Sequence, residues 1–215
     1  MNDYLILSIT IIYALLAYFI PIILCKKGKL EKFSARSLVH LFAGLSIFSL
    51  LFIENKILLF IASAMFTIVL FFSRKSTPVL KFVFNSLNEP EEKKCLQGPI
   101  LYSAAISFLV LFSAITGNII VPVASALIMI ISDPLASFFG KKYGKNKMSL
   151  LSTQRTFEGS FAMMMSAGII VSLIFGFGIK AFAIGFILAI IELITPSKMD
   201  DFSLPLAACI LLTNY

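Results

Sequence analysis

The stretch MIISDPLASFFGKKYGKNK (129–147) decides how the rest of the sequence is interpreted. It leaves a long apolar segment at Asp133-Pro134, continues through small and apolar residues, and ends in a basic loop that begins at Gly140 and includes Gly144. A carboxylate is costly to place in a bilayer, and proline interrupts the hydrogen bonding of a helix. We therefore predict that one helix ends at Asp133-Pro134 and that another begins there, with exposed backbone N–H groups that favour an anion.

The composition of the whole chain is that of a polytopic membrane protein. Of the 215 residues, 59% are hydrophobic and 13% are charged, and the mean hydropathy is +0.98. Soluble domains are roughly half apolar and a quarter charged. Several apolar segments approach the roughly 20 residues that cross a bilayer. We predict an all-α fold, a membrane helical bundle of seven to eight transmembrane helices in one integral-membrane domain (1–215), with spans near 4–25, 37–53, 57–73, 99–116, 118–139, 157–178, 181–195 and the short 203–213.

The basic residues predict the orientation in the membrane. The loops 26–36, 74–98 and 140–156 carry five each and Lys198 adds one, so 16 of the 18 Lys and Arg residues fall on one side. The positive-inside rule assigns this side to the cytoplasm. The net charge of +7 is then explained by the bilayer as partner, without nucleic acid. The sequence indicates no particular oligomeric state.

Polar residues at the ends of apolar segments carry chemical information, because desolvating them is costly unless they have partners or a function. Arg36 and His40 begin the second segment four residues apart, so they share a helical face. Five acidic residues lie at the ends of later segments: Asp133, Glu158, Glu192, Asp200 and Asp201. In the predicted orientation all of these groups face the cytoplasm. We therefore predict a shared polar pocket on that side.

These residues suit the handling of phosphate groups. Gly140 and Gly144 allow close approach to the backbone, and Lys141, Lys142 and Lys147 supply cations for a polyphosphate. Asp133 and Glu158 offer the oxygen ligands that Mg²⁺ prefers together with water and phosphate oxygens. The sequence has no G-x-x-x-x-G-K-[ST], so it does not predict a P-loop enzyme.

Each polar group also has a purely structural interpretation. His40 is then a hydrogen-bonded helix residue, and Asp133 is a cap followed by proline at the first helical position. Glu158 then only favours the amino terminus of its helix through the helix dipole. Glu192, with apolar neighbours on both sides, is the hardest to explain in this way.

The order of these residues resembles the signature of the CTP-dependent lipid kinases, which include dolichol kinase, phytol kinase and the yeast-type diacylglycerol kinase. That signature reads G-D-x-x-A-x-x-x-G-[RK]-[RK]-[FY]-G, followed by a basic loop and [KR]-[ST]-x-E-G-[ST]. The matching residues are Asp133, Ala136, Gly140, Lys141, Lys142, Tyr143, Gly144, Arg155, Thr156, Glu158, Gly159 and Ser160.

Two flanking patterns also resemble this family, and the resemblance extends from about residue 36 to the carboxyl end. ARSLVHLFAGL (35–45) is similar to the family's R-K-x-x-H-x-x-x-G, and IELITPSKMDDFSLPLAA (191–208) is similar to its E-x-x-x-P and D-N-x-x-x-P-L patterns. Three residues depart from the family pattern: Ser132 stands in place of Gly, Ser37 in place of Lys, and Asp201 in place of Asn.

The resemblance implies transfer of the γ-phosphate of CTP to a lipid alcohol, which yields a lipid monophosphate and CDP. An isoprenoid alcohol, such as dolichol, polyprenol, phytol or geranylgeraniol, is the expected substrate, and the compact chain favours a prokaryotic cell membrane. Asp133 and Glu158 are expected to position Mg²⁺, or another divalent cation, or the attacking hydroxyl. His40 or Glu192 is expected to receive the hydroxyl proton, and Asp200 and Asp201 to add metal affinity. The residues expected to bind the nucleotide are Gly140, Lys141, Lys142, Gly144, Lys147, Arg155, Thr156, Gly159, Ser160 and Arg36.

Two other functions are consistent with parts of this pattern. A CTP:phosphatidate cytidylyltransferase uses the same nucleotide, but nothing in the chain resembles that family's P-G-H-G-G-x-x-D-R stretch. A membrane transporter also uses broken helices and buried carboxylates. Against it, the polar groups gather at one membrane face and the sequence shows no inverted repeat.

Overall fold

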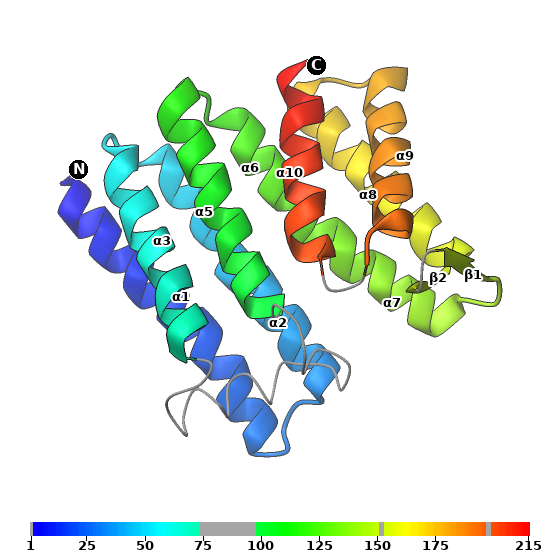
Figure 1. Cartoon of the computed structure of the whole chain (residues 1–215), viewed down its shortest axis with the longest axis horizontal. Coiled ribbons are helices and arrows are strands. Elements are labelled where there is room, and N and C mark those ends of the chain that lie inside the picture. Colours follow the sequence, from blue (N-terminus) through cyan, green and yellow to red (C-terminus); the bar gives the residue numbers. More distant parts are fainter. Residues whose placement is uncertain (1, 74–97, 151–152, 197–198) are drawn as a thin grey trace. The chain divides into compact units, whose positions relative to one another are not determined.

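The computed structural model describes residues 2–73, 98–150, 153–196 and 199–215. These residues form two compact units, Met1–Ile119 and Ile120–Tyr215 (Figure 1), and each unit is described by itself. Most of the predicted basic loop 74–98 and Lys198 lie outside the described residues. The single domain predicted over 1–215 stays a prediction.

The first unit is built from two pairs of helices. Helix α1 packs mainly on α2, whereas α3 packs mainly on α5. The Asp3 carboxylate accepts hydrogen bonds from the backbone N–H groups of Glu54 and Asn55, at 3.2 and 2.9 Å, and so fixes the start of α1 against the turn before α3. The elements are α1 (Asp3–Lys26), α2 (Lys32–Gly44), the 3-10 helix η1 (Leu45–Leu51), α3 (Lys56–Ser73) and α5 (Gly98–Thr116).

The second unit contains a long helical stretch with a π-helical turn inside it, a β-hairpin and three further helices. The hairpin pairs Lys147 with Thr156 and Leu150 with Thr153 in antiparallel register, inside the stretch that we predicted as a polar loop. The other described elements follow the predicted helical fold. They are α6 (Ile120–Leu127), the π-helical turn η3 (Ile128–Ser132), α7 (Asp133–Tyr143), β1 (Lys147–Leu150), β2 (Thr153–Thr156), α8 (Phe157–Phe175), α9 (Ile179–Ile194) and α10 (Asp200–Thr213).

The predicted break at Asp133-Pro134 is wrong. One helical stretch runs from Ile120 to Tyr143, and Ser132 has helical backbone angles, φ −73° and ψ −38°. Pro134 lacks an N–H, and its ring crowds the carbonyl four positions earlier, which normally kinks or ends a helix. The π-helical turn adds a residue at this point and relieves the crowding, so the helix continues. No new helix end with exposed N–H groups forms at Asp133.

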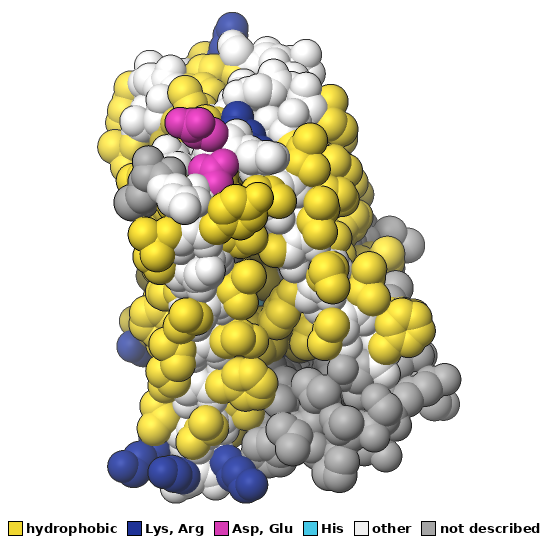
Figure 2. Space-filling view, turned by 90° about the vertical axis from the view of Figure 1, so that its left-hand side faces the viewer, with side chains coloured by type: hydrophobic (Ala, Val, Ile, Leu, Met, Phe, Trp, Pro, Cys, Tyr) yellow, Lys and Arg dark blue, Asp and Glu magenta, His cyan; other side chains and the backbone are white. Residues whose placement is uncertain are grey.

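The apolar helices make this an integral membrane protein. Five stretches of the described chain are long and apolar enough to span a bilayer: Asp3–Lys26, Ser34–Leu51, Gly98–Thr116, Ile120–Tyr143 and Phe157–Phe175. Figure 2 shows a face that is largely covered by hydrophobic side chains, with basic side chains along its lower edge. Helices α9 and α10 have only 16 and 14 residues, so the predicted count of seven to eight spans is not confirmed.

Glycines bring α8 and α9 into close contact. A Cβ atom added at Gly185 would lie 2.4 Å from the carbonyl oxygen of Met164 and 2.9 Å from the backbone nitrogen of Gly168. A Cβ at Gly168 would in turn lie 2.7 Å from the Phe182 ring. Small residues allow such close backbone packing between membrane helices.

We predict that Gly185→Ala destabilises the protein by roughly 1–3 kcal/mol, because the methyl group has no space between two backbones. The measurement is thermal unfolding in detergent micelles. Gly178→Ala is the matched control, since Gly178 has extended backbone and its nearest contact for a Cβ is the Tyr215 hydroxyl at 4.0 Å. Equal unfolding temperatures for the two variants would contradict the packing described here.

Candidate functional site

Arg155 on β2 joins the ends of two helices in the second unit. Its Nη1 donates to Oε1 of Glu192 at 2.8 Å, and its Nη2 donates to Oδ2 of Asp200 at 2.7 Å. The side chain of Arg155 is 14% exposed and that of Glu192 is 2% exposed, so these ion pairs are largely buried. Burial disfavours the charged guanidinium, but the carboxylates of Glu192 and Asp200 outweigh this effect and raise the pKa of Arg155. The guanidinium therefore stays charged.

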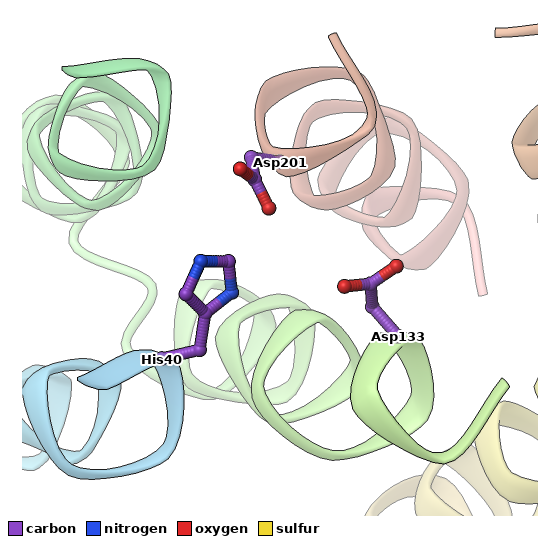
Figure 3. Close-up of side chains that lie close together, drawn as sticks. All are labelled: His40, Asp133 and Asp201. Atoms are coloured by element: carbon purple, nitrogen blue, oxygen red, sulfur yellow. The ribbon is translucent and has the colours of Figure 1, made fainter. Parts of the chain in front are cut away.

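Two further carboxylates lie beside this pair of salt bridges. Asp133, the first residue of α7, and Asp201, the second residue of α10, each place a carboxylate oxygen within 4.8 Å of the other. Figure 3 shows the two carboxylates reaching into the same space from different helices. The negative charge of Asp133 also acts on Arg155. We call Asp133, Glu192, Asp200 and Asp201 the carboxylate cluster.

The Asp133 and Asp201 pair has the chemistry and the spacing of a divalent cation site. Mg²⁺ and Ca²⁺ bind carboxylate oxygens at about 2.1 and 2.4 Å, so one ion spans oxygens up to about 4.2–4.8 Å apart. The two aspartates come from elements far apart in sequence, and Asp201 is buried. The residues present therefore fit a hard cation. Asp133 and Asp201 both belong to the set that we predicted as metal ligands, together with Glu158 and Asp200.

Glu158 instead holds the loop that follows α7. Its Oε1 accepts a hydrogen bond from the backbone N–H of Lys145 at 3.2 Å and lies 3.5 Å from Nδ2 of Asn146. Glu158 lies in the first turn of α8. Thr156 caps this amino-terminal end, because its hydroxyl accepts a hydrogen bond from the N–H of Gly159 at 3.2 Å. Within the described chain, Oε2 of Glu158 is buried without a hydrogen-bond partner. Glu158 thus retains one acceptor next to the basic loop.

The glycines of the signature have a packing role that sequence reasoning missed. A Cβ atom at Gly144 would lie 2.5 Å from Cγ2 of Thr156, and one at Gly140 would lie 2.9 Å from Oγ1 of Thr156. One at Gly159 would lie 2.9 Å from the carbonyl oxygen of Ala136. The spacing of Ala136, Gly140 and Gly144, every fourth residue, is the signal for small residues on one face of α7 and at the residue that follows its last turn. The nucleotide contacts predicted for these glycines stay predictions.

The predicted phosphate-binding lysines remain on the surface. Lys141 and Lys142 are exposed in the last turn of α7, and Lys147 is exposed at the start of β1. The ammonium group of Lys142 lies 5.4 and 5.2 Å from the ring centroids of Phe138 and Tyr143. The Ser160 hydroxyl is buried and has no hydrogen-bond partner in the described parts of the chain.

Arg36 and His40 belong to α2 in the first unit. His40 is buried, its ring lies 4.4 Å from the ring of Tyr102, and its carbonyl oxygen accepts a hydrogen bond from the Tyr102 hydroxyl. Arg36 is half-buried on the same helix. Their predicted roles in nucleotide binding and proton transfer stay predictions.

Comparison of the chain with protein-family models, with curated proteins and with solved structures finds no match. The site is therefore interpreted from its own residues.

We predict that Arg155→Gln lowers the free energy of unfolding by about 3 kcal/mol, because it leaves the buried Glu192 carboxylate without its counter-charge. Thermal unfolding in detergent measures the change. Adding Glu192→Gln to this variant should restore part of the loss, which a double-mutant cycle quantifies. Lys147→Gln, at an exposed position, is the control and should unfold like the unaltered protein. Additive effects of Arg155→Gln and Glu192→Gln on the free energy of unfolding would contradict the ion pair.

Proposed function

We propose that the protein is a CTP-dependent lipid-alcohol kinase that phosphorylates an isoprenoid alcohol and uses Mg²⁺ or a similar divalent cation. The observation that carries the proposal is the convergence of residues that match the lipid kinase signature. Arg155 lies far in sequence from the acidic residues that surround it. It forms salt bridges with Glu192 and Asp200, and the negative charge of Asp133 also acts on it. A set of apolar helices that only needed orienting charges would not require this arrangement.

The carboxylate cluster suits the positioning that phosphoryl transfer demands. This reaction depends mostly on alignment and on neutralisation of negative charge, rather than on covalent steps with the protein. A divalent cation held by Asp133 and Asp201 would supply charge neutralisation at the transferred phosphate. Arg155 fixes Asp200, whose Oδ1 accepts from the backbone N–H of Asp201 at 2.9 Å. Arg155 therefore acts as a positioning residue in this proposal, because its guanidinium already serves two carboxylates.

Other groups of the second unit would bind the phosphates and accept the proton. Lys141 and Lys142 at the end of α7 and Lys147 at the start of β1 are exposed cations and are proposed to bind the polyphosphate of CTP. Oε2 of Glu192 is buried and has no hydrogen-bond partner among the described residues, so it is the proposed acceptor for the hydroxyl proton. The positive-inside rule supports a cytoplasmic site, where CTP is available. The prokaryotic cell membrane stays an expectation from the family resemblance.

The test is a kinase assay on the purified protein, with CTP and ATP labelled at the γ-phosphate and a panel of lipid alcohols. We expect Asp133→Asn to lower CTP-dependent activity at least about 100-fold, because it removes a carboxylate that would hold the divalent cation beside the transferred phosphate. Glu31→Gln is the matched control, because Glu31 is exposed, lies in the first unit and makes no side-chain cap.

The released nucleotide separates the proposal from its nearest alternative. A kinase releases CDP, whereas a cytidylyltransferase releases pyrophosphate. Full activity of a folded Asp133→Asn variant would refute the site, and pyrophosphate as the product would refute the reaction. Solute flux in proteoliposomes without lipid phosphorylation would favour a transporter.

A further inference from the structure

The first unit contains a large apolar crevice between α1 and α3. Its volume is about 490 Å³, within the roughly 300–1,000 Å³ range of small-molecule sites. The crevice exists because α1 packs on α2 and α3 packs on α5, while α1 and α3 touch each other only sparingly. Its inner wall is formed by buried side chains of η1, α3 and α5: Ile47, Leu59, Tyr102 and Val110.

The lining is chemically apolar although it contains hydroxyl groups. Thr10 and Ser49 donate to carbonyl oxygens one turn earlier in their own helices, at 2.8 and 2.7 Å. Ser63 and Ser103 do the same, at 2.9 and 3.0 Å. The Tyr102 hydroxyl donates to the His40 carbonyl and so presents its ring to the crevice. These hydrogen bonds use most of the hydroxyl donors of the lining, so the walls favour a hydrocarbon over a polar head group.

The mouth of the crevice is continuous with the surface that faces the bilayer. Ile11 on α1 and Ile61 and Met65 on α3 line the crevice, and they are 43%, 48% and 60% exposed. Neighbouring side chains on the outer faces of the same helices, such as Leu16 and Ile68, are also exposed but lie outside the crevice. In a membrane, the medium at this mouth is lipid hydrocarbon rather than water.

We propose that this crevice binds a single hydrocarbon chain of a membrane lipid, which enters sideways from the bilayer between α1 and α3. The proposed occupant is a fatty acyl chain of a bilayer phospholipid, because this hydrocarbon surrounds the mouth of the crevice. The driving force is dispersion contact with a preformed apolar wall, since lipid tails gain little from leaving other lipid tails. The inference is independent of the proposed kinase activity, because the crevice lies wholly within the first unit and binding is measured without catalysis.

The experiment is photocrosslinking of the full chain in nanodiscs. One arm uses a phospholipid with a diazirine on its acyl chain, and the other uses a diazirine analogue of geranylgeraniol. We expect crosslinked peptides to be enriched at crevice residues such as Met65 over outer-face residues such as Leu16 and Ile68. Predominant labelling of the crevice by the phospholipid probe supports the proposal, whereas predominant labelling by the isoprenoid probe would overturn the assignment of a phospholipid acyl chain.

A matched pair of substitutions on α3 tests the site. Ala62 lines the crevice, whereas Ala64, also half-buried, does not. Ala62→Phe should fill space that several methylene groups of the ligand occupy and lower crevice labelling about tenfold, while Ala64→Phe leaves it unchanged. Even labelling of crevice and outer faces in the unaltered protein would overturn the proposal, whether or not the variants fold. So would a folded Ala62→Phe variant that labels like Ala64→Phe.

Discussion

The second unit depends on the compensation of buried negative charge by Arg155. Four carboxylates converge there from three different helices, and like charges at such distances repel strongly when water is scarce. The guanidinium forms salt bridges with two of them, Glu192 and Asp200, at 2.8 and 2.7 Å. Arg155 lies on a β-hairpin rather than on a helix. The hairpin is therefore not a passive connection. It carries the cation that lets the ends of α9 and α10 approach each other.

The position of the hairpin depends in turn on close packing between α7 and α8. Thr156, the residue after Arg155, caps α8 and fills the space above Gly140 and Gly144. Larger residues at those glycines would push β2 away from α7 and shift Arg155 with it. The π-helical turn before Asp133 contributes at the other side, because an added residue rotates every later side chain of the helix about its axis. Helix packing and local helix geometry together bring Asp133 beside Asp201.

Much of this fold follows from one-dimensional signals, and the rest requires tertiary contacts. The length of the apolar segments predicted the long helices. The acidic residues at the ends of distant segments were predicted to lie together, because all of them fall on the same predicted side of the membrane. The continuity of the helix through Pro134 was missed, because the rule that proline ends helices is local and ignores a compensating π-helical turn. The salt bridges of Arg155 were not predicted, since a basic residue in a loop does not reveal which buried acids it will meet. The four-residue spacing of Ala136, Gly140 and Gly144 was visible in the sequence, but its packing role against Thr156 and α8 was not predicted. The phosphate contacts predicted for Arg155 and the glycines stay predictions.

The two units present opposite chemistry, and this contrast limits what each can contribute to a reaction on a lipid. Most hydroxyl groups that line the crevice of the first unit donate to carbonyl oxygens, so its walls suit a hydrocarbon chain rather than a head group. The second unit has the reverse character, because Glu158 and Glu192 each have a buried carboxylate oxygen without a hydrogen-bond partner among the described residues. In the proposed kinase, recognition of a hydrocarbon and chemistry on a phosphate would therefore be carried by different residues. Selectivity for a lipid chain could then change through the walls of the crevice while the charged residues stay the same.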